Sequence, residues 1–358
     1  MSTARGVPAD ETALVRLASG GDEAAFGELA ARYRGQLRAH CYRMLGSVTD
    51  AEDALQEALL RAWQGMAGFQ GRGSVRSWLY SIATNAALDI ARHRSRRELP
   101  VDLGRYAEPG AGLGPPLADP LWLEPYPDRW LTRDVTTSPE ASYEQRESVE
   151  LAFVVALQHL PPRQRAVLLL REVAGFSTAE ICSQLGSSAP SVNSALQRAR
   201  AAVRDRLPAS SQQSALRALG DRRTRALAER YADALERGDA DTLISMLTED
   251  ATWSMPPLRA WFRGHGPIRD FLVRSPLTER WRHHPASANG QLAVGCYLFD
   301  SAAQRYLPAV IDVLTLDGGK IAAVTAFLTS RALGPAAPGD WVTGAQLFSR
   351  FGLPLELA

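Results

Sequence analysis

The 358-residue chain is long enough for two or three domains, and its 46% hydrophobic and 22% charged residues are typical of a globular protein. This composition excludes a fully disordered chain, a collagen-like fibre and a small disulfide scaffold. No run approaches the ~18 apolar residues of a membrane-spanning helix, and Met1–Gly6 lacks the apolar core of a signal peptide, so we expect a cytoplasmic protein. Cys41, Cys182 and Cys296 lie far apart, which predicts neither a disulfide framework nor a metal site.

The net charge of +1 conceals an uneven distribution along the chain. Residues 1–97 hold 13 arginines against 10 acidic residues, residues 98–147 hold 4 against 10, and residues 160–207 hold 7 against 3. Two basic segments therefore flank an acidic one. Basic segments of this kind indicate contacts with nucleic acid.

Residues 10–97 are expected to be entirely helical, because apolar residues recur there at helical spacing. In the segment Asp50–Trp63 they form a single face, and Thr49 with Glu52 predicts a capping box at its start. A second long helix is expected from Ser74 to Arg97, where it ends in a run of arginines.

Each of these helices carries a face that could bind a partner. The first face is acidic and suits a protein with a basic groove, although such faces are often only solvated; its residues are Asp50, Glu52, Asp53, Gln56 and Glu57. The second helix begins with two aromatic residues, and polar and basic residues at intervals of four, three and four are expected to share a face further along. These residues are Trp78 and Tyr80, then Asn85, Asp89, Arg92 and Arg96. Aromatic rings beside a basic rail suit single-stranded DNA; the alternative is a core tryptophan and a solvated helix end.

Residues 98–144 are predicted to be a linker, because eight prolines prevent a long helix. Within it, Leu121–Asp128 is both aromatic and acidic. Such a segment either docks on a neighbouring domain or threads a channel of a partner.

Residues 145–207 are again expected to be helical. One amphipathic helix covers 148–160, and a second starts at the adjacent prolines 161–162. A third is opened by a capping box of Ser177 and Glu180, and Gly186 then makes a turn into a last helix. The outer face of that last helix is polar and basic, with Ser191, Asn193, Ser194, Gln197 and Arg198. The pattern predicts a DNA-binding helix-turn-helix, with plain helix packing as the alternative.

Residues 220–335 are predicted to form an α+β domain, with helices on one face of a curved antiparallel sheet, followed by a tail over 336–358. Two helices meet at Gly238, a typical helix stop, and Asp239 can cap the second. Asn289-Gly290 predicts a tight hairpin turn. The expected strands are 251–255, 282–288, 291–299, 309–316 and 320–328.

A pocket in this domain would be aromatic. Its candidate residues are Trp253, Met255, Trp261, His265, Phe271 and Tyr297, with His283 and His284 as further candidates. The two adjacent histidines point to opposite faces of a strand, so they cannot both line the pocket. Acid–base catalysis in such a pocket would need a carboxylate, but Asp250 and Asp270 are placed for solvated or capping roles. We therefore expect no catalytic residue; ligand sensing and purely structural contact are the alternatives.

Four segments occur in the same order as in extracytoplasmic-function (ECF) sigma factors, which the first 207 residues resemble: 50–58, 69–89, 160–168 and 195–200. The resemblance implies two helical sigma domains, 10–97 and 145–207. It implies that the acidic face docks on the β′ clamp of RNA polymerase, that 69–97 melts and captures the −10 promoter element, and that the helix-turn-helix reads the −35 element. The implied partners are core polymerase, through its β′ clamp and β flap, and promoter DNA.

The rest of the chain resembles ECF factors that carry a fused SnoaL-like domain, on the basis of 121–128 and 251–257. The resemblance implies a cone-shaped fold that regulates the sigma factor in cis. The turn Asp317, Gly318, Gly319 and Lys320 is similar to a regulatory Asp-Gly-Gly-Gly-Arg signature, with one glycine fewer and lysine for arginine.

The sequence thus predicts a promoter-specificity subunit of RNA polymerase that needs no cofactor and performs no chemistry itself. Its acidic linker could mimic nucleic acid in the polymerase's RNA exit path. The alternative is a SnoaL-type or isomerase-type enzyme, or a ligand sensor, tethered to a DNA-binding module. A simple repressor would leave 50–97 unexplained.

Overall fold

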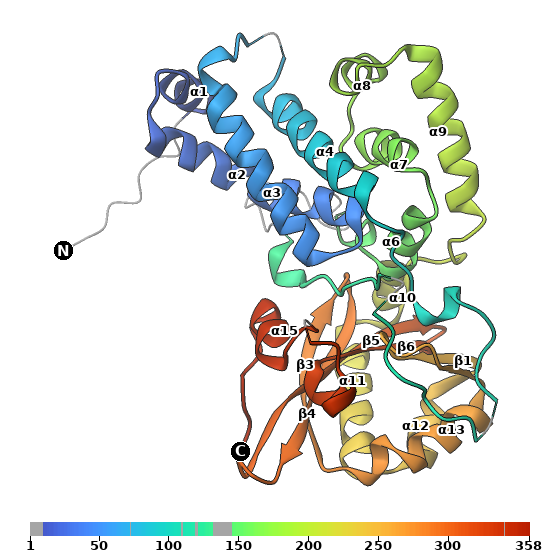
Figure 1. Cartoon of the computed structure of the whole chain (residues 1–358). Helices are drawn as coiled ribbons and strands as arrows, with labels where there is room; N and C mark the ends of the chain where they lie inside the picture. The colour runs from blue at the N-terminus through green and yellow to red at the C-terminus, as the bar shows by residue number, and fades with distance from the viewer. Residues whose placement is uncertain (1–9, 72, 109, 119–120, 132–144, 340) are drawn as a thin grey trace. The chain divides into compact units, whose positions relative to one another are not determined.

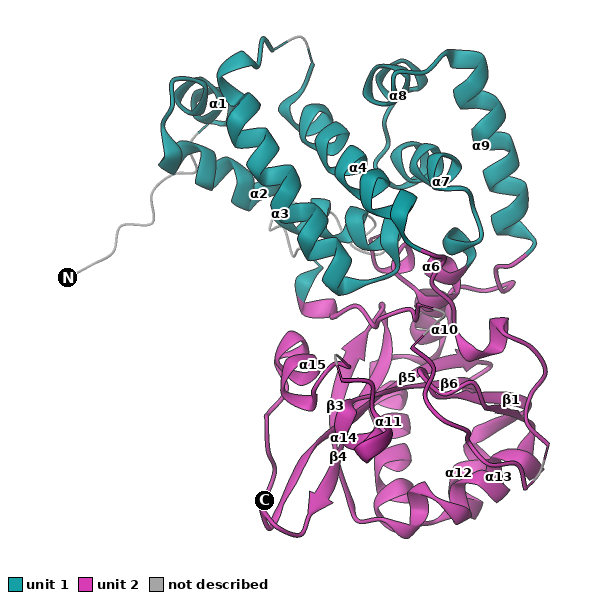
Figure 2. Cartoon of the chain, viewed as in Figure 1, with its two compact units in different colours: residues 1–94, 130–132, 156–205 teal, residues 95–129, 133–155, 206–358 magenta. Residues whose placement is uncertain are grey.

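The computed structural model describes residues 10–71, 73–108, 110–118, 121–131, 145–339 and 341–358. Parts of the expected linker, namely 109, 119–120 and 132–144, lie outside the described residues. The chain divides into two compact units (Figure 2). Unit 1 comprises residues 1–94, 130–132 and 156–205, and unit 2 comprises 95–129, 133–155 and 206–358. No helix among the described residues has the length and apolar character needed to cross a membrane.

The first part of unit 1 is a helical bundle. Its helices are α1 (Glu11–Ser19), α2 (Glu23–Leu45), α3 (Val48–Gly65), the 3-10 turn η1 (Met66–Gly68) and α4 (Val75–His93). α2, α3 and α4 pack against one another (Figure 1). The shared core is apolar and includes Leu37, Leu55 and Leu79, all less than 3% exposed.

Two boundaries in this bundle differ from the sequence prediction. The N-cap of α3 is Ser47, whose hydroxyl accepts a hydrogen bond from the Asp50 amide, so the predicted capping box at Thr49 is wrong because Thr49 is already helical. The predicted helix to Arg97 is also too long. α4 ends at His93, because Arg94 adopts an extended conformation with ψ of 142°.

The second part of unit 1 contains α6 (Leu151–Gln158), α7 (Pro162–Leu168), the π-helical turn η4 (Leu169–Val173), α8 (Thr178–Leu185) and α9 (Ala189–Arg204). The division between the units falls within α6. α6 is shorter than the predicted helix 148–160, because Ser148 and Val149 form a turn. The predicted capping box of Ser177 and Glu180 opens α8, and Gly186 ends it with a φ of 56°.

Unit 2 is built on one six-stranded sheet in the order β2-β1-β6-β5-β4-β3. Its strands are β1 (Leu247–Ser254), β2 (Trp261–Arg263), β3 (Trp281–Ala288), β4 (Gln291–Asp300), β5 (Arg305–Asp317) and β6 (Lys320–Leu328). Asn289-Gly290 makes the predicted hairpin turn between β3 and β4. The prediction of a wholly antiparallel sheet is wrong, since β1 and β6 run parallel. The sequence prediction also missed β2.

Helices lie on both faces of this sheet. α11 (Asp221–Glu236), α12 (Ala240–Met246) and α13 (His265–Arg274) contribute to one core with the inner face of the sheet (Figure 1). On the outer face, the ring of Phe348 in α15 (Gly344–Phe351) packs against the Tyr297 ring, with 4.9 Å between their centroids. The remaining elements are α10 (Gln212–Leu219), α14 (Ser330–Leu333) and the 3-10 turns η2 (Pro100–Asp102), η3 (Asp128–Trp130), η5 (Pro276–Thr278) and η6 (Gly334–Ala336).

Candidate nucleic-acid interface and ligand cavity

The predicted acidic face of α3 is only partly exposed. Asp53, Gln56 and Glu57 are exposed, and Glu57 pairs with Arg61 at 2.7 Å. Asp50 is buried and pairs with Arg94 at 3.2 Å, whereas Glu52 is half-buried and pairs with Arg38. The acidic surface available to a partner is therefore narrower than the sequence predicts, because Asp50 and Glu52 form ion pairs with arginines of unit 1.

The aromatic residues near the start of α4 have different environments. Trp78 is half-buried, and its ring lies 5.1 Å from that of Phe69. Tyr80 is 5% exposed and contacts the rings of His40 and Phe176. Of the two, only Trp78 presents a ring that could stack on a base without unpacking the core.

The polar series on α4 is interrupted. Asn85 and Arg92 are exposed, and Asp89 pairs with Arg92 at 2.7 Å and with Arg61 at 3.2 Å. Arg96 lies beyond the end of the helix and pairs with Glu98, so it does not share the helical face as predicted. The exposed arginines Arg92 and Arg94 nevertheless lie at the C-terminal end of α4.

Within unit 1, α4 also contacts the helix-turn-helix. The Gln184 side chain donates to the Ser77 hydroxyl at 2.8 Å, and the Ser81 hydroxyl donates to the Gln184 carbonyl at 3.3 Å. Arg76 donates to the Ala174 carbonyl at 2.8 Å and lies over the Phe176 ring at 4.7 Å. Through these contacts the helix-turn-helix packs against α4 and covers the face of α4 next to Trp78.

The helix-turn-helix presents a free polar face on α9. Ser191, Asn193, Gln197 and Arg198 are exposed, while Ser194 is half-buried and accepts a hydrogen bond from Arg198 at 2.5 Å. The opposite face packs on the domain core, with Val192, Leu196, Ala199 and Val203 buried. This is the geometry that places a helix in a DNA major groove.

The linker docks on the sheet of unit 2. Tyr126 and Asn289 form a reciprocal pair. The Tyr126 amide donates to the Asn289 side-chain oxygen at 2.8 Å, and the Asn289 amide donates to the Tyr126 carbonyl at 2.8 Å. The Gly290 amide donates to Asp128 at 2.8 Å, and the Asn289 side chain donates to the Val149 carbonyl at 2.7 Å. Of the two sequence alternatives, the structure therefore shows docking on a neighbouring domain.

Further contacts fix the earlier part of the linker. The Ala107 amide donates to the Trp261 carbonyl at 2.7 Å, and the Leu117 amide donates to the Pro257 carbonyl at 3.0 Å. The Gly110 amide donates to Asp270 at 2.9 Å. The linker is thus bonded to β2, to the segment that precedes β2 and to α13.

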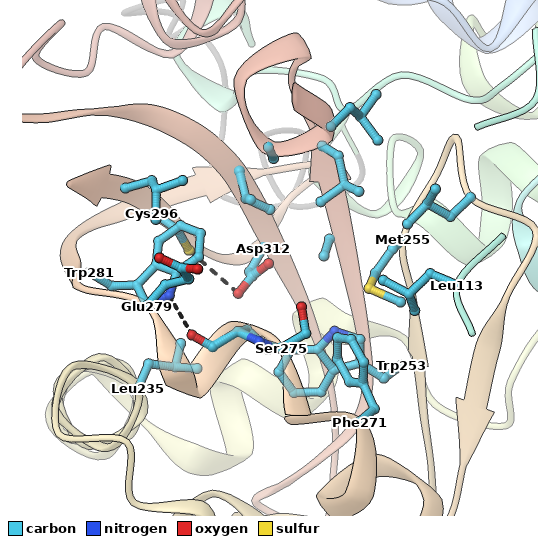
Figure 3. A pocket seen from close by; sticks show the side chains of 18 of the residues that line it. Leu113, Leu235, Trp253, Met255, Phe271, Ser275, Glu279, Trp281, Cys296 and Asp312 are labelled. Atoms are coloured by element: carbon cyan, nitrogen blue, oxygen red, sulfur yellow. Dashed lines mark hydrogen bonds between the residues drawn. The ribbon is translucent and has the colours of Figure 1, made fainter. Parts of the chain in front are cut away.

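A cavity of about 420 Å³ opens in unit 2 between the sheet and its inner helices (Figure 3). We call it the Asp312 cavity. Most of its wall is apolar and includes Trp253, Met255, Phe271 and Trp281. The polar groups in the wall are Ser275, Glu279, His283, Cys296 and Asp312. Linker residues Leu113, Gly114 and Pro116 form another part of the wall.

Asp312 is the principal buried acid of this cavity. Its Oδ2 accepts hydrogen bonds from the Tyr231 hydroxyl at 2.8 Å and from the Cys296 thiol at 3.5 Å. Among the described residues, no hydrogen bond ends on Oδ1. Burial raises the pKa of Asp312 to about 6, and it raises the pKa values of Tyr231 and Cys296 well above their usual ranges. The cavity therefore holds a carboxylate that accepts hydrogen bonds above this pH.

No cluster of three or more potential metal ligands occurs in the part of the chain that the structure describes. His283 lines the cavity, and burial lowers its pKa to about 4 although Glu236 acts in the opposite direction. It is therefore neutral at physiological pH.

Comparisons with known proteins match this architecture. Three family descriptions fit in order: Sigma-70 region 2 over residues 29–97, Sigma-70 region 4 over 150–203, and SnoaL-like domain over 228–324. The chain is 40% identical over 328 residues to the ECF RNA polymerase sigma factor SigG of Mycobacterium tuberculosis, covering 91% of this chain and 83% of that protein. The chain belongs to the ECF sigma factor family. As a sigma factor, it binds core RNA polymerase and promoter DNA and acts in transcription initiation.

Two further comparisons concern SigJ of the same organism. The sigma factor is 27% identical to it over 341 residues, covering 90% of this chain and 94% of SigJ. The crystal structure of SigJ superposes with a TM-score of 0.55 and 23% identity, covering 92% of this chain and 99% of the other. That similarity supports the fold: helical sigma domains followed by a SnoaL-like domain with a mixed sheet.

The structure separates the predicted pocket residues of the sigma factor into two groups. Trp253, Met255 and Phe271 line the Asp312 cavity. Trp261, His265 and Tyr297 do not: they bond instead to the carbonyls of Gly104, Thr248 and Pro354. Tyr297 follows Cys296 along β4, so strand alternation turns its ring to the outer face.

Asp312 was not among the candidate acids for the pocket. Those candidates, Asp250 and Asp270, are exposed or half-exposed and pair with Arg263 and Arg274. The sequence does hold a signal for Asp312. It is the single acid in the predicted apolar strand 309–316, and because side chains alternate along a strand, it faces the same side as the buried Val310 and Leu314. His283 lines the cavity and its neighbour His284 does not, so the two histidines do not share the pocket, as strand alternation predicts.

The predicted regulatory turn of Asp317, Gly318, Gly319 and Lys320 joins β5 to β6, and all four residues are exposed. A Cβ on Gly319 would lie 3.6 Å from Leu219 of α10, so the turn lies beside that helix.

Proposed function

We propose that α9 reads the −35 element and that Trp78 with the basic end of α4 captures the melted −10 element. Exposed Ser191, Asn193, Gln197 and Arg198 support the first assignment, because these side-chain types bond to base edges and phosphates. The exposed acids of α3 dock on the polymerase β′ clamp, and the helix-turn-helix binds the β flap. The protein works in the cytoplasm, where the polymerase acts, and performs no chemistry itself.

We further propose that the SnoaL-like domain regulates the sigma factor in cis by holding the linker. The observation that carries this proposal is the reciprocal pair of Tyr126 and Asn289, reinforced by Asp128 and Gly290. A linker held by these bonds is not free to enter the polymerase. Release of the linker is therefore a step toward the active state, and transcription should increase when the bonds are removed.

The test is in vitro transcription by core polymerase with the full chain, on a fragmented genomic library. Asn289→Gly removes the side chain that holds Tyr126 and Val149 but tolerates the positive φ of 56° at this position. The matched control is Gln304→Gly, which has a φ of 53° in another turn and bonds only locally to Ser301.

We expect specific transcripts from the unaltered protein and a several-fold increase for Asn289→Gly, with no change for Gln304→Gly. An unchanged or lower yield from Asn289→Gly, with the protein folded, would contradict linker restraint. If no folded variant gave a specific transcript, the proposed promoter contacts would be wrong.

Asp312 favours a second candidate function, because a buried acid with a raised pKa in an apolar cavity is an arrangement that isomerase-type enzymes use. In this alternative the domain is an enzyme tethered to a DNA-binding module. A compound recovered chemically changed after incubation with the full chain would support the enzyme, whereas recovery of the unchanged compound supports sensing.

A further inference from the structure

The Asp312 cavity has the properties of a small-molecule site. Its volume of about 420 Å³ lies within the range of ~300–1,000 Å³ that is usual for such sites. Apolar and aromatic side chains dominate its wall, and a few polar groups converge on it (Figure 3). This combination binds molecules that are mostly apolar and carry one or two polar atoms.

The acid at the cavity wall specifies which polar atom the molecule carries. Asp312 is 4% exposed, and Tyr231 and Cys296 both donate to Oδ2. Oδ1 receives no hydrogen bond from the described residues. This oxygen is not among the fully buried polar atoms that lack a partner, so it is accessible from the cavity that Asp312 lines, and a bound O–H or N–H group would donate to it.

Binding in the cavity is coupled to the position of the linker. Leu113, Gly114 and Pro116 belong to the linker and also form part of the cavity wall. A molecule in the cavity contacts them only while the linker is docked. It therefore binds the docked state more tightly than the released state, and by linkage it holds the linker in place.

We propose that the Asp312 cavity binds an apolar, ring-containing molecule with an O–H or N–H donor directed at Asp312, and that this molecule stabilises the docked linker. The direction of regulation follows: such a ligand lowers transcription. This inference rests on the proposed linker restraint only for its effect on transcription. Binding itself is independent of that proposal.

The first test measures binding to the full chain. The probe is N-phenyl-1-naphthylamine, a fluorescent apolar molecule with one N–H donor; its partner is 1-phenylnaphthalene, which has similar rings and no donor. We expect the amine to bind about tenfold more tightly, because a hydrogen bond to a charged group is lost with the hydrocarbon. Displacement of the fluorescent amine reports the affinity of the hydrocarbon.

Substitutions locate the bound probe. Asp312→Asn should weaken binding of the amine about tenfold and leave the hydrocarbon unaffected, whereas the control Asp250→Asn, on the exposed start of β1, should change neither. Equal affinities of the two probes for the unaltered protein would overturn the proposed role of Asp312. That result remains decisive even if Asp312→Asn fails to fold.

Hydrogen exchange of the full chain tests the effect on the linker. Saturating amine should slow exchange at Ala107 and Leu117, whose amides bond to the Trp261 and Pro257 carbonyls. Exchange in α3 should not change. Binding without linker protection would overturn the coupling. Binding with linker protection but unchanged transcription would leave this inference intact and contradict the proposed restraint instead.

Discussion

At the scale of single residues, the most unusual group is the carboxyl of Asp312. It is surrounded by an apolar core that includes Trp253, Phe271 and Val310. Two donors reach one of its oxygens, but burial outweighs them and raises its pKa to about 6. The folded protein therefore retains this proton at a pH where the unfolded chain has lost it.

The raised pKa of Asp312 makes the stability of the folded protein depend on pH. Because the folded pKa is about 6 and the usual value is 3.8, the stabilisation by Asp312 is complete below pH ~4 and is lost as the pH rises through 6. Asp312→Asn removes this dependence. We expect the free energy of unfolding of the unaltered protein, relative to that of the variant, to fall by about 2 kcal/mol between pH 4 and pH 7. Urea denaturation of both proteins at each pH measures it; a constant difference would contradict it.

At the scale of elements, the helix-turn-helix shows how one helix serves both the core and the surface. α9 buries Val192, Leu196 and Ala199 and exposes the polar side chains between them. Two of its arginines differ in their contacts. Arg200 pairs with Glu172 at 2.5 Å, whereas Arg198 bonds, within the described part of the chain, only to Ser194 of its own helix. Arg198 can therefore turn toward DNA at little cost.

We expect Arg198→Ala to weaken binding of the polymerase holoenzyme to its −35 element by ~1–3 kcal/mol, or about 10-fold to 100-fold. Arg200→Ala is the matched control, since it removes the same charge from the same helix. Its effect should be smaller and independent of the −35 sequence. Fluorescence anisotropy with promoter duplexes that carry native or altered −35 elements measures both. Equal losses for the two variants would mean that Arg198 contributes charge only.

The sequence predicts those parts of the fold that depend on neighbouring residues. The capping box of Ser177 and the hairpin turn at Asn289 were both confirmed, because each is determined by short-range bonds. The parallel pairing of β1 with β6 was not predictable in this way, since it joins residues about 70 positions apart. The role of Asp312 was missed for a similar reason: its donors Tyr231 and Cys296 come from α11 and β4.

At the scale of the whole molecule, segments between the two sigma domains belong to the compact unit of the SnoaL-like domain. One buried acid, Glu150, and one half-buried acid, Asp128, help to fix them there. Glu150 accepts hydrogen bonds from the Gln212 and Gln213 amides at 2.9 and 2.8 Å, at the start of α10. Asp128 accepts from Gly290. Burial raises the pKa of Glu150 to about 7 and that of Asp128 to about 6.

These shifts make attachment of the segments dependent on pH. A carboxyl whose pKa is raised on docking stabilises the docked state most at low pH, and this stabilisation is lost as the pH rises through the raised value. For Glu150 the loss falls around pH 7, so we expect docking to weaken about tenfold between pH 6 and pH 8. The measurement is the hydrogen-exchange protection of the Leu151 and Asn289 amides, corrected for intrinsic exchange at each pH. Protection should fall over this range in the unaltered protein and stay level in Glu150→Gln, whereas a fall of the same size in that variant would show that another group controls the attachment.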